Sequence, residues 1–116
     1  PDMPAEFTRT ITVTPATALE GVVRVPGDKS ISHRYAMIAA LAEGVTRITH
    51  YSQGNDCQST LRCLEQLGTV ISRHSVLDRE TGADVPTVQI VGRGLRGLQP
   101  AGADLDCGNS GSTLRM

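Results

Sequence analysis

The sequence at residues 21–34 is GVVRVPGDKSISHR, and its pattern changes in the middle. Residues 21–25 are rich in valine, which favours a strand, and the Pro26-Gly27 pair favours a turn. From Ser30 the apolar spacing becomes helical, and Gly44 is the expected stop for that helix. The helix is predicted to bury one stripe of side chains, namely Ile31, Tyr35, Ile38, Ala39 and Ala42. A strand, a turn and a helix in this order indicate the start of a mixed α/β fold.

A second helix is predicted after a strand over residues 45–51. Asn55 or Asp56 is expected to cap this helix, and Gly68 is expected to end it. Its apolar face consists of Leu61, Leu64 and Leu67.

The remaining segments are shorter. A strand is expected to begin at residues 70–71, a polar turn covers 78–86, and another strand covers 87–91. Residues 113–116 look like the first turn of a further helix. The order after residue 20 is therefore β, α, β, α, β, β, an α/β (α+β) chain. Ahead of it, residues 1–8 are expected to be a loose end and residues 10–14 a strand.

The composition excludes several classes of protein. Eleven basic residues nearly balance twelve acidic ones, so the chain lacks the charge of a nucleic-acid-binding surface. No stretch approaches the roughly 20 apolar residues of a membrane span, and the first residues lack a signal-peptide pattern, so a cytoplasmic location is expected. Cys57, Cys63 and Cys107 form no C-x-x-C pair, which indicates buried free thiols and not a disulfide set or a zinc site.

One loop that could carry chemistry precedes the first predicted helix. Lys29 is the only lysine among eleven basic residues, and Ser30 and Arg34 lie one helical turn apart on the same face. A helix start with free N–H groups, an ammonium, a hydroxyl and a guanidinium suits a phosphate together with a carboxylate or hydroxyls. A capped helix with solvated charges is the alternative interpretation.

A second loop, residues 108–113, is the glycine-rich run GNSGST, and Arg115 follows it. Glycines let the backbone approach a ligand, and successive N–H groups in such a turn can hold an anion. The loop is neither a Walker A motif nor a dinucleotide fingerprint. A flexible loop that ends in a Ser/Thr helix cap is the alternative.

Both loops together, with Asp56 opening a leucine-rich helix between them, resemble the N-terminal part of the 5-enolpyruvylshikimate-3-phosphate synthase family. The resemblance runs from about Ile11 to Met116. It implies transfer of an enolpyruvyl group from phosphoenolpyruvate to the 5-hydroxyl of shikimate 3-phosphate, with release of phosphate, on the chorismate route to aromatic amino acids. It implies no metal or organic cofactor.

The resemblance also implies roles for single residues. Lys29 matches the lysine that touches both substrates and stabilises or transfers charge during the addition. Ser30 and Arg34 match residues that hold shikimate 3-phosphate, and Gly111 matches the glycine that lies against phosphoenolpyruvate and against its competitor, the herbicide glyphosate. Further positions that shape the same pocket are matched by Asn109, Ser112, Arg115 and Asp56. Ser112 stands where some members carry threonine, and it keeps the hydroxyl.

The implied fold has two domains, each of three βαβαββ units, with the substrates between them. Residues 21–116 would be the first unit plus the start of the next helix, and residues 1–20 would include a strand of the other domain. On this interpretation the chain is a truncated, N-terminal part of a monomeric enzyme and is inactive by itself. Two alternatives stay open: the sister transferase that acts on UDP-N-acetylglucosamine, and a non-catalytic anion-binding module.

Overall fold

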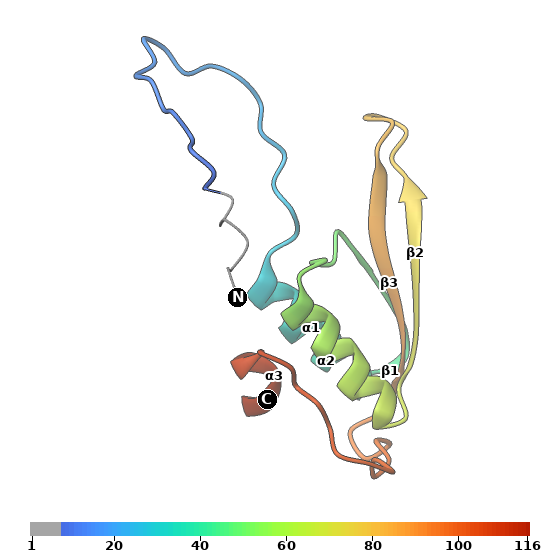
Figure 1. Cartoon of the computed structure of the whole chain (residues 1–116). Helices are drawn as coiled ribbons and strands as arrows, with labels where there is room; N and C mark the ends of the chain where they lie inside the picture. Colours follow the sequence, from blue (N-terminus) through green and yellow to red (C-terminus); the bar gives the residue numbers. More distant parts are fainter. Residues whose placement is uncertain (1–7) are drawn as a thin grey trace, which may run out of the picture.

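A computed structural model describes residues 8–116 of the chain (Figure 1). Its helices and strands are α1 (Lys29–Leu41), β1 (Glu43–Thr49), α2 (Asn55–Gln66), β2 (Val70–Leu77), β3 (Asp84–Arg93) and α3 (Gly111–Arg115). Across this part of the chain, each helix is too short or too polar to cross a membrane.

The three strands form one sheet in the order β1-β3-β2. The central strand, β3, pairs antiparallel with both neighbours. Figure 1 shows α1 and α2 on the same side of this sheet, with α3 beyond them. The fold is thus a mixed α/β arrangement with a helical layer on an antiparallel sheet.

The core lies between the sheet and the two long helices. Val88 and Ile90 alternate with half-buried Gln89 along β3, as expected for a strand with one covered face. They meet small residues of α1 and larger ones of α2 and the loop before it: Ala36, Ala39, Ala40, Tyr51, Leu61 and Leu64. Close approach of α1 to the sheet requires Gly92, since a Cβ there would lie 2.0 Å from the carbonyl oxygen of Ala42.

The predicted buried stripe of α1 is wrong for its three large side chains, whereas Ala39 is buried as predicted and Ala42 is half-buried. Ile31, Tyr35 and Ile38 are 53%, 56% and 63% exposed, and the buried face instead carries Ser32 and His33 ahead of the alanines. Both polar side chains are hydrogen-bonded, Ser32 to the carbonyl oxygen of Asp28 and His33 to Thr60. Apolar periodicity cannot detect such a face, because partners elsewhere in the chain make the burial of polar groups tolerable.

Several predicted boundaries also change. α1 ends at Leu41, and Gly44 lies inside β1 with a φ of +90°. Gly54 occupies the cap position of α2, so Asp56 lies within its first turn. Gly68, with a φ of +95°, does follow the end of α2 as predicted. β2 and β3 are longer than expected. They pair with each other along their whole shared length, and the pairing continues to Leu77 opposite Asp84.

The two strands predicted near the N-terminus are absent. Residues 10–14 and 21–25 have no partner strand among residues 8–116, and Val22 and Val23 are almost fully exposed. An extended segment needs a neighbouring strand to form the hydrogen bonds of a sheet. The order from α1 to β3, which is α, β, α, β, β, therefore lacks the first strand of the expected unit. The loose end expected over 1–8 lies outside the described residues except for its last residue.

Candidate anion-binding site

The turn before α1 is held by its own polar groups. The Asp28 carboxylate accepts a hydrogen bond of 2.7 Å from the N–H of Ile31, and the Ser32 hydroxyl accepts one of 3.0 Å from the N–H of Ser52. Gly27 is required here, because a Cβ would lie 1.6 Å from the carbonyl oxygen of His50. The helix start is thus capped by Asp28, and fewer of its N–H groups are free for an anion than the sequence predicted.

Lys29 forms an ion pair with Asp56. Its Nζ lies 2.5 Å from the Asp56 carboxylate, which joins the first turn of α1 to the first turn of α2. The hydrogen bond that the Lys29 ammonium donates to the Asp56 carboxylate, and the negative charge of that carboxylate, raise the pKa of Lys29, so the ammonium is kept protonated. Asp56, which the sequence suggested as a helix cap, is instead the partner of Lys29.

The two loops predicted from the sequence meet in space. Ser30 and Arg34 of α1 and Ser112 and Arg115 of α3 line one hollow of about 170 Å³, together with His33 and Met116. Two guanidinium groups and two hydroxyls surround it, and none of the described acidic side chains, all within residues 8–116, lines it. This donor set suits a phosphate or carboxylate, because arginine can donate two parallel hydrogen bonds to either group.

The other predicted site residues do not line this hollow. Lys29 and Asp56 lie beside Ser30, at the start of α1 and α2, and Asn109 is exposed on the loop before α3. Gly111 opens α3, and a Cβ on it would meet nothing within 4 Å. The sharp bend of the loop occurs instead at Gly108, with a φ of +56°, whose N–H donates to the Asp106 carboxylate. The space in front of Gly111 is therefore open to a ligand.

A chain of hydrogen bonds begins at His33, which is one of the residues that line the hollow. His33 Nδ1 is 2.6 Å from the hydroxyl oxygen of Thr60, which is 2.7 Å from that of Thr113. The Thr113 hydroxyl donates to the hydroxyl of Ser110 at 2.7 Å, and the Ser110 oxygen also caps α3. All four side chains are buried. Sequence analysis missed this relay; the only signal was a threonine beside Leu61 on the buried side of a helix.

A family model described as EPSP synthase (3-phosphoshikimate 1-carboxyvinyltransferase) matches residues 13–116, which include both loops. The chain belongs to the EPSP synthase family. This confirms the resemblance carried by the two loops.

Relatives within the EPSP synthase family are much longer. The chain is 51% identical over 104 residues to the 3-phosphoshikimate 1-carboxyvinyltransferase of Solibacter usitatus, covering 90% of this chain and 22% of that protein. It is 46% identical over 109 residues to the enzyme of the same name from Koribacter versatilis, covering 93% and 23%. It also superimposes on EPSP synthase from Acinetobacter baumannii with a TM-score of 0.66 and 38% identity, covering 82% of this chain and 20% of that one. The chain spans about a fifth of the length of these proteins.

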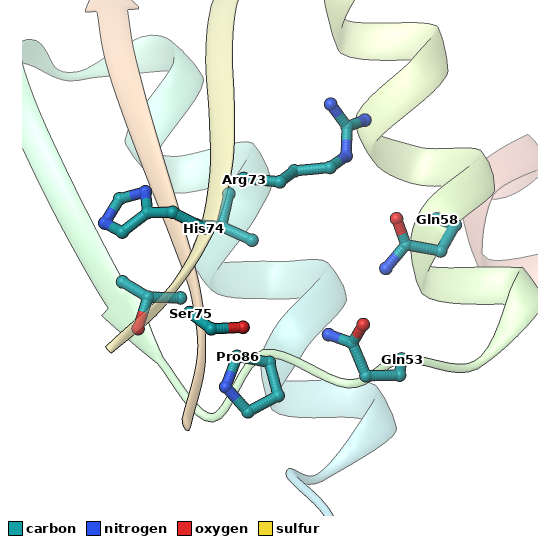
Figure 2. Close-up of a pocket in the computed structure, with 8 residues that line it drawn as sticks. Gln53, Gln58, Arg73, His74, Ser75 and Pro86 are labelled. Atoms are coloured by element: carbon teal, nitrogen blue, oxygen red, sulfur yellow. The ribbon is translucent and has the colours of Figure 1, made fainter. Parts of the chain in front are cut away.

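Two further hollows are less suited to the anions of EPSP synthases. One of about 210 Å³ lies between the start of α2 and strands β2 and β3 (Figure 2). Its arginine, Arg73, already pairs with Glu65 at 2.6 Å, and the amides of Gln53 and Gln58 donate to backbone oxygens. Another, of about 360 Å³, is lined mainly by leucine and methionine side chains of the helices and of the segment between β3 and α3.

The cysteines lie apart from the hollow that Ser30, Arg34, Ser112 and Arg115 line, which we call the cationic hollow. Cys57 and Cys63 are buried, as predicted, and Cys107 is half-buried. Cys63 donates to the carbonyl oxygen of Asp106 at 3.4 Å, and Cys57 to that of Lys29 at 3.5 Å. Burial raises the pKa of both thiols, so both are protonated near neutral pH.

Proposed function

We propose that this chain forms one wall of the active site of a 3-phosphoshikimate 1-carboxyvinyltransferase. The reaction transfers the enolpyruvyl group of phosphoenolpyruvate to the 5-hydroxyl of shikimate 3-phosphate and releases phosphate. The observation that carries the proposal is the cationic hollow, in which two loops that identify the family contribute Ser30, Arg34, Ser112 and Arg115 to one site. Because the chain spans about a fifth of its relatives, the opposite wall belongs to the rest of the protein.

The residues of this wall have separate roles in the proposal. Ser30 and Arg34 hold shikimate 3-phosphate, and Ser112 and Arg115 close the same hollow from the side of α3. Lys29, kept protonated by Asp56, lies beside Ser30 and faces solvent, where it can touch both substrates. The open space in front of Gly111 admits phosphoenolpyruvate or glyphosate, and Asn109 lies next to it.

These roles fit the chemistry of the reaction. The 5-hydroxyl adds to C2 of phosphoenolpyruvate while C3 takes up a proton, and phosphate then leaves the tetrahedral intermediate. Two anionic substrates have to approach each other, and fixed cationic groups that offset their repulsion lower the barrier. This wall supplies that charge, while the remaining acid and base groups lie elsewhere in the protein.

We also propose that residues 21–116 form one βαβαββ unit of a larger domain together with the start of the next helix, with residues 21–25 as the first strand of the unit and residues 10–14 in the other domain. The exposed Ile31, Tyr35 and Ile38 support this proposal. A helix that is apolar on its outer face as well as its inner face is typical of the interior of a larger domain. Neighbouring units of the same protein would cover this outer face.

The test is phosphate release by the full-length protein that carries this sequence. We expect turnover with shikimate 3-phosphate and phosphoenolpyruvate, no turnover with UDP-N-acetylglucosamine, and none by residues 1–116 alone. Lys29→Met should lower turnover by about 100-fold or more, since it removes a fixed donor at the reacting charge. Arg47→Met is the matched control, because Arg47 is an exposed cation on β1.

Each other outcome supports a different interpretation. Turnover with the UDP-sugar alone would indicate the sister transferase. Turnover that Lys29→Met leaves unchanged would indicate that this part of the chain only binds anions. Activity of the isolated 116 residues would contradict the proposed division of the active site between two walls.

A further inference from the structure

The cationic hollow is built from two separate helices. Ser30 and Arg34 lie on α1, whereas Ser112 and Arg115 lie on α3, about 80 positions later in the sequence. Both helices pack against α2. The distance between the two halves of the site therefore depends on the contacts that α2 makes with α1 on one side and with α3 on the other.

Thr60 of α2 is the residue that contacts both sides through hydrogen bonds. Its hydroxyl oxygen lies 2.6 Å from His33 Nδ1 on α1 and 2.7 Å from the Thr113 hydroxyl on α3. The three side chains are at most 8% exposed, so little of their surface is open to bulk water. A buried hydrogen-bond network of this kind holds one arrangement, because a shift of either helix leaves a buried polar group unpaired.

The direction of the relay follows from the number of protons available. Thr113 donates its single hydroxyl proton to Ser110, so its oxygen accepts from Thr60. Thr60 has then used its own proton, and its oxygen accepts from the N–H of His33 at Nδ1. The ring is neutral, since burial lowers the pKa of His33, and the neighbouring Lys29 ammonium lowers it further.

The other ring nitrogen, Nε2, is left as an acceptor. It is buried and has no hydrogen-bond partner among residues 8–116, and the His33 ring forms part of the lining of the hollow. An unpaired buried nitrogen is unfavourable by itself. The hydrogen bond between Nδ1 and Thr60 is thus the interaction that favours a histidine over an apolar side chain at this position.

We propose that His33 is a positioning residue for the anion site: through Thr60 and Thr113 it fixes Ser112 and Arg115 opposite Ser30 and Arg34. The proposal rests on the proposed function for its effect on catalysis, but the structural coupling exists without substrate. Loss of the relay removes none of Ser30, Arg34, Ser112 and Arg115, but it lets α3 move away from α1 and take Ser112 and Arg115 with it.

The kinetic experiment uses the full-length protein and matched variants. Thr60→Val keeps the shape of the side chain and breaks the relay, whereas Thr60→Ser keeps the hydroxyl. Likewise His33→Leu removes the donor, and His33→Asn retains an N–H near Nδ1. Thr69→Val is the control, because Thr69 is also buried and its hydroxyl has no partner in the part of the chain that the structure describes.

We expect the two relay-breaking variants to raise the KM for shikimate 3-phosphate by about five- to tenfold, the effect of one lost hydrogen bond. Thr60→Ser and His33→Asn should restore the KM to within about twofold, and Thr69→Val should leave it unchanged. A relay-breaking variant that is folded by circular dichroism and keeps the wild-type KM would overturn the proposal. So would an equal loss in Thr60→Ser and Thr60→Val.

Hydrogen exchange provides a readout that needs no turnover. In Thr60→Val the amides of residues 110–115 should exchange about five- to tenfold faster than in wild type, while those of β3 keep their rates. Unchanged exchange at 110–115 would overturn the proposal even if activity fell. If the wild-type protein lacks turnover, the proposed function fails, and the exchange result still decides the coupling. Thr113→Val serves in the same way if Thr60→Val does not fold.

Discussion

Substitution of Gly27 by alanine tests whether the turn before α1 has the tight packing described above. The new Cβ would lie 1.6 Å from the carbonyl oxygen of His50 and 2.9 Å from its carbonyl carbon. An ordinary carbon–oxygen contact is about 3.4 Å, so the two backbones have to separate by about 1.8 Å. Neither atom can rotate away, because the backbone fixes the position of the Cβ and the His50 carbonyl group is part of the main chain.

The expected cost follows from this overlap. Overpacking of a filled site costs typically about 1–3 kcal/mol, and a clash between two backbones belongs at the upper end of that range. Alanine also restricts the unfolded chain more than glycine does, which by itself stabilises the folded state by about 0.4–1 kcal/mol. The net loss in the free energy of unfolding for Gly27→Ala is therefore about 2–2.5 kcal/mol.

Gly102→Ala is the matched control, because a Cβ at Gly102 would meet nothing within 4 Å. It should be neutral or stabilise the protein by up to about 1 kcal/mol. Urea unfolding followed by circular dichroism, with both variants measured beside the wild type, gives the comparison. If the two variants agree to within about 0.5 kcal/mol, the contact between Gly27 and His50 does not exist as described.

Three other predictions concern the site. Gly111→Ala should leave the thermal midpoint unchanged, since a Cβ there has free space, but should weaken inhibition by glyphosate and raise the KM for phosphoenolpyruvate; a fall in the midpoint without a change in inhibition would contradict the proposed ligand contact. The free energy of unfolding should decrease as the pH falls below about 6.5, by up to about 1.4 kcal/mol per pH unit. The reason is that His33 takes up a proton in the unfolded chain at a higher pH than in the folded one, where burial and the Lys29 ammonium lower its pKa more than the nearby Asp56 carboxylate raises it. His33→Asn should remove that part of the slope in urea titrations at several pH values, and an unchanged slope would assign it to another group. Asp56→Asn should lower the pKa of Lys29, measured by NMR titration of its Cε resonance, and an unchanged pKa would show that the ion pair does not form in solution.

The second helix shows what local pattern can predict. Leu61 and Leu64 are buried as expected, Leu67 is half-buried, and Gly68 follows the end of the helix in a left-handed conformation. Here large apolar side chains at helical spacing decide the buried face, and a glycine decides the end. Both effects act within a few residues, so the sequence alone contains them.

The first helix shows where that reasoning fails. Its large apolar side chains at Ile31, Tyr35 and Ile38 are exposed, and Ser32 and His33 are buried because Ser52 and Thr60 supply hydrogen bonds. The strands expected at residues 10–14 and 21–25 are absent for the same kind of reason. Partners distant in the sequence decide both results.

The sequence by itself determined the family, the two loops and the residue types that suit small anions, because each depends on a short run of residues in a fixed order. Only the tertiary structure decided that Ser30 and Arg34 share a hollow with Ser112 and Arg115, that Asp56 pairs with Lys29, and that His33 is joined to Thr113 through Thr60. Those contacts join separate elements, and they exist only once helices and sheet have packed. Local spacing along the chain carries no information about such distances.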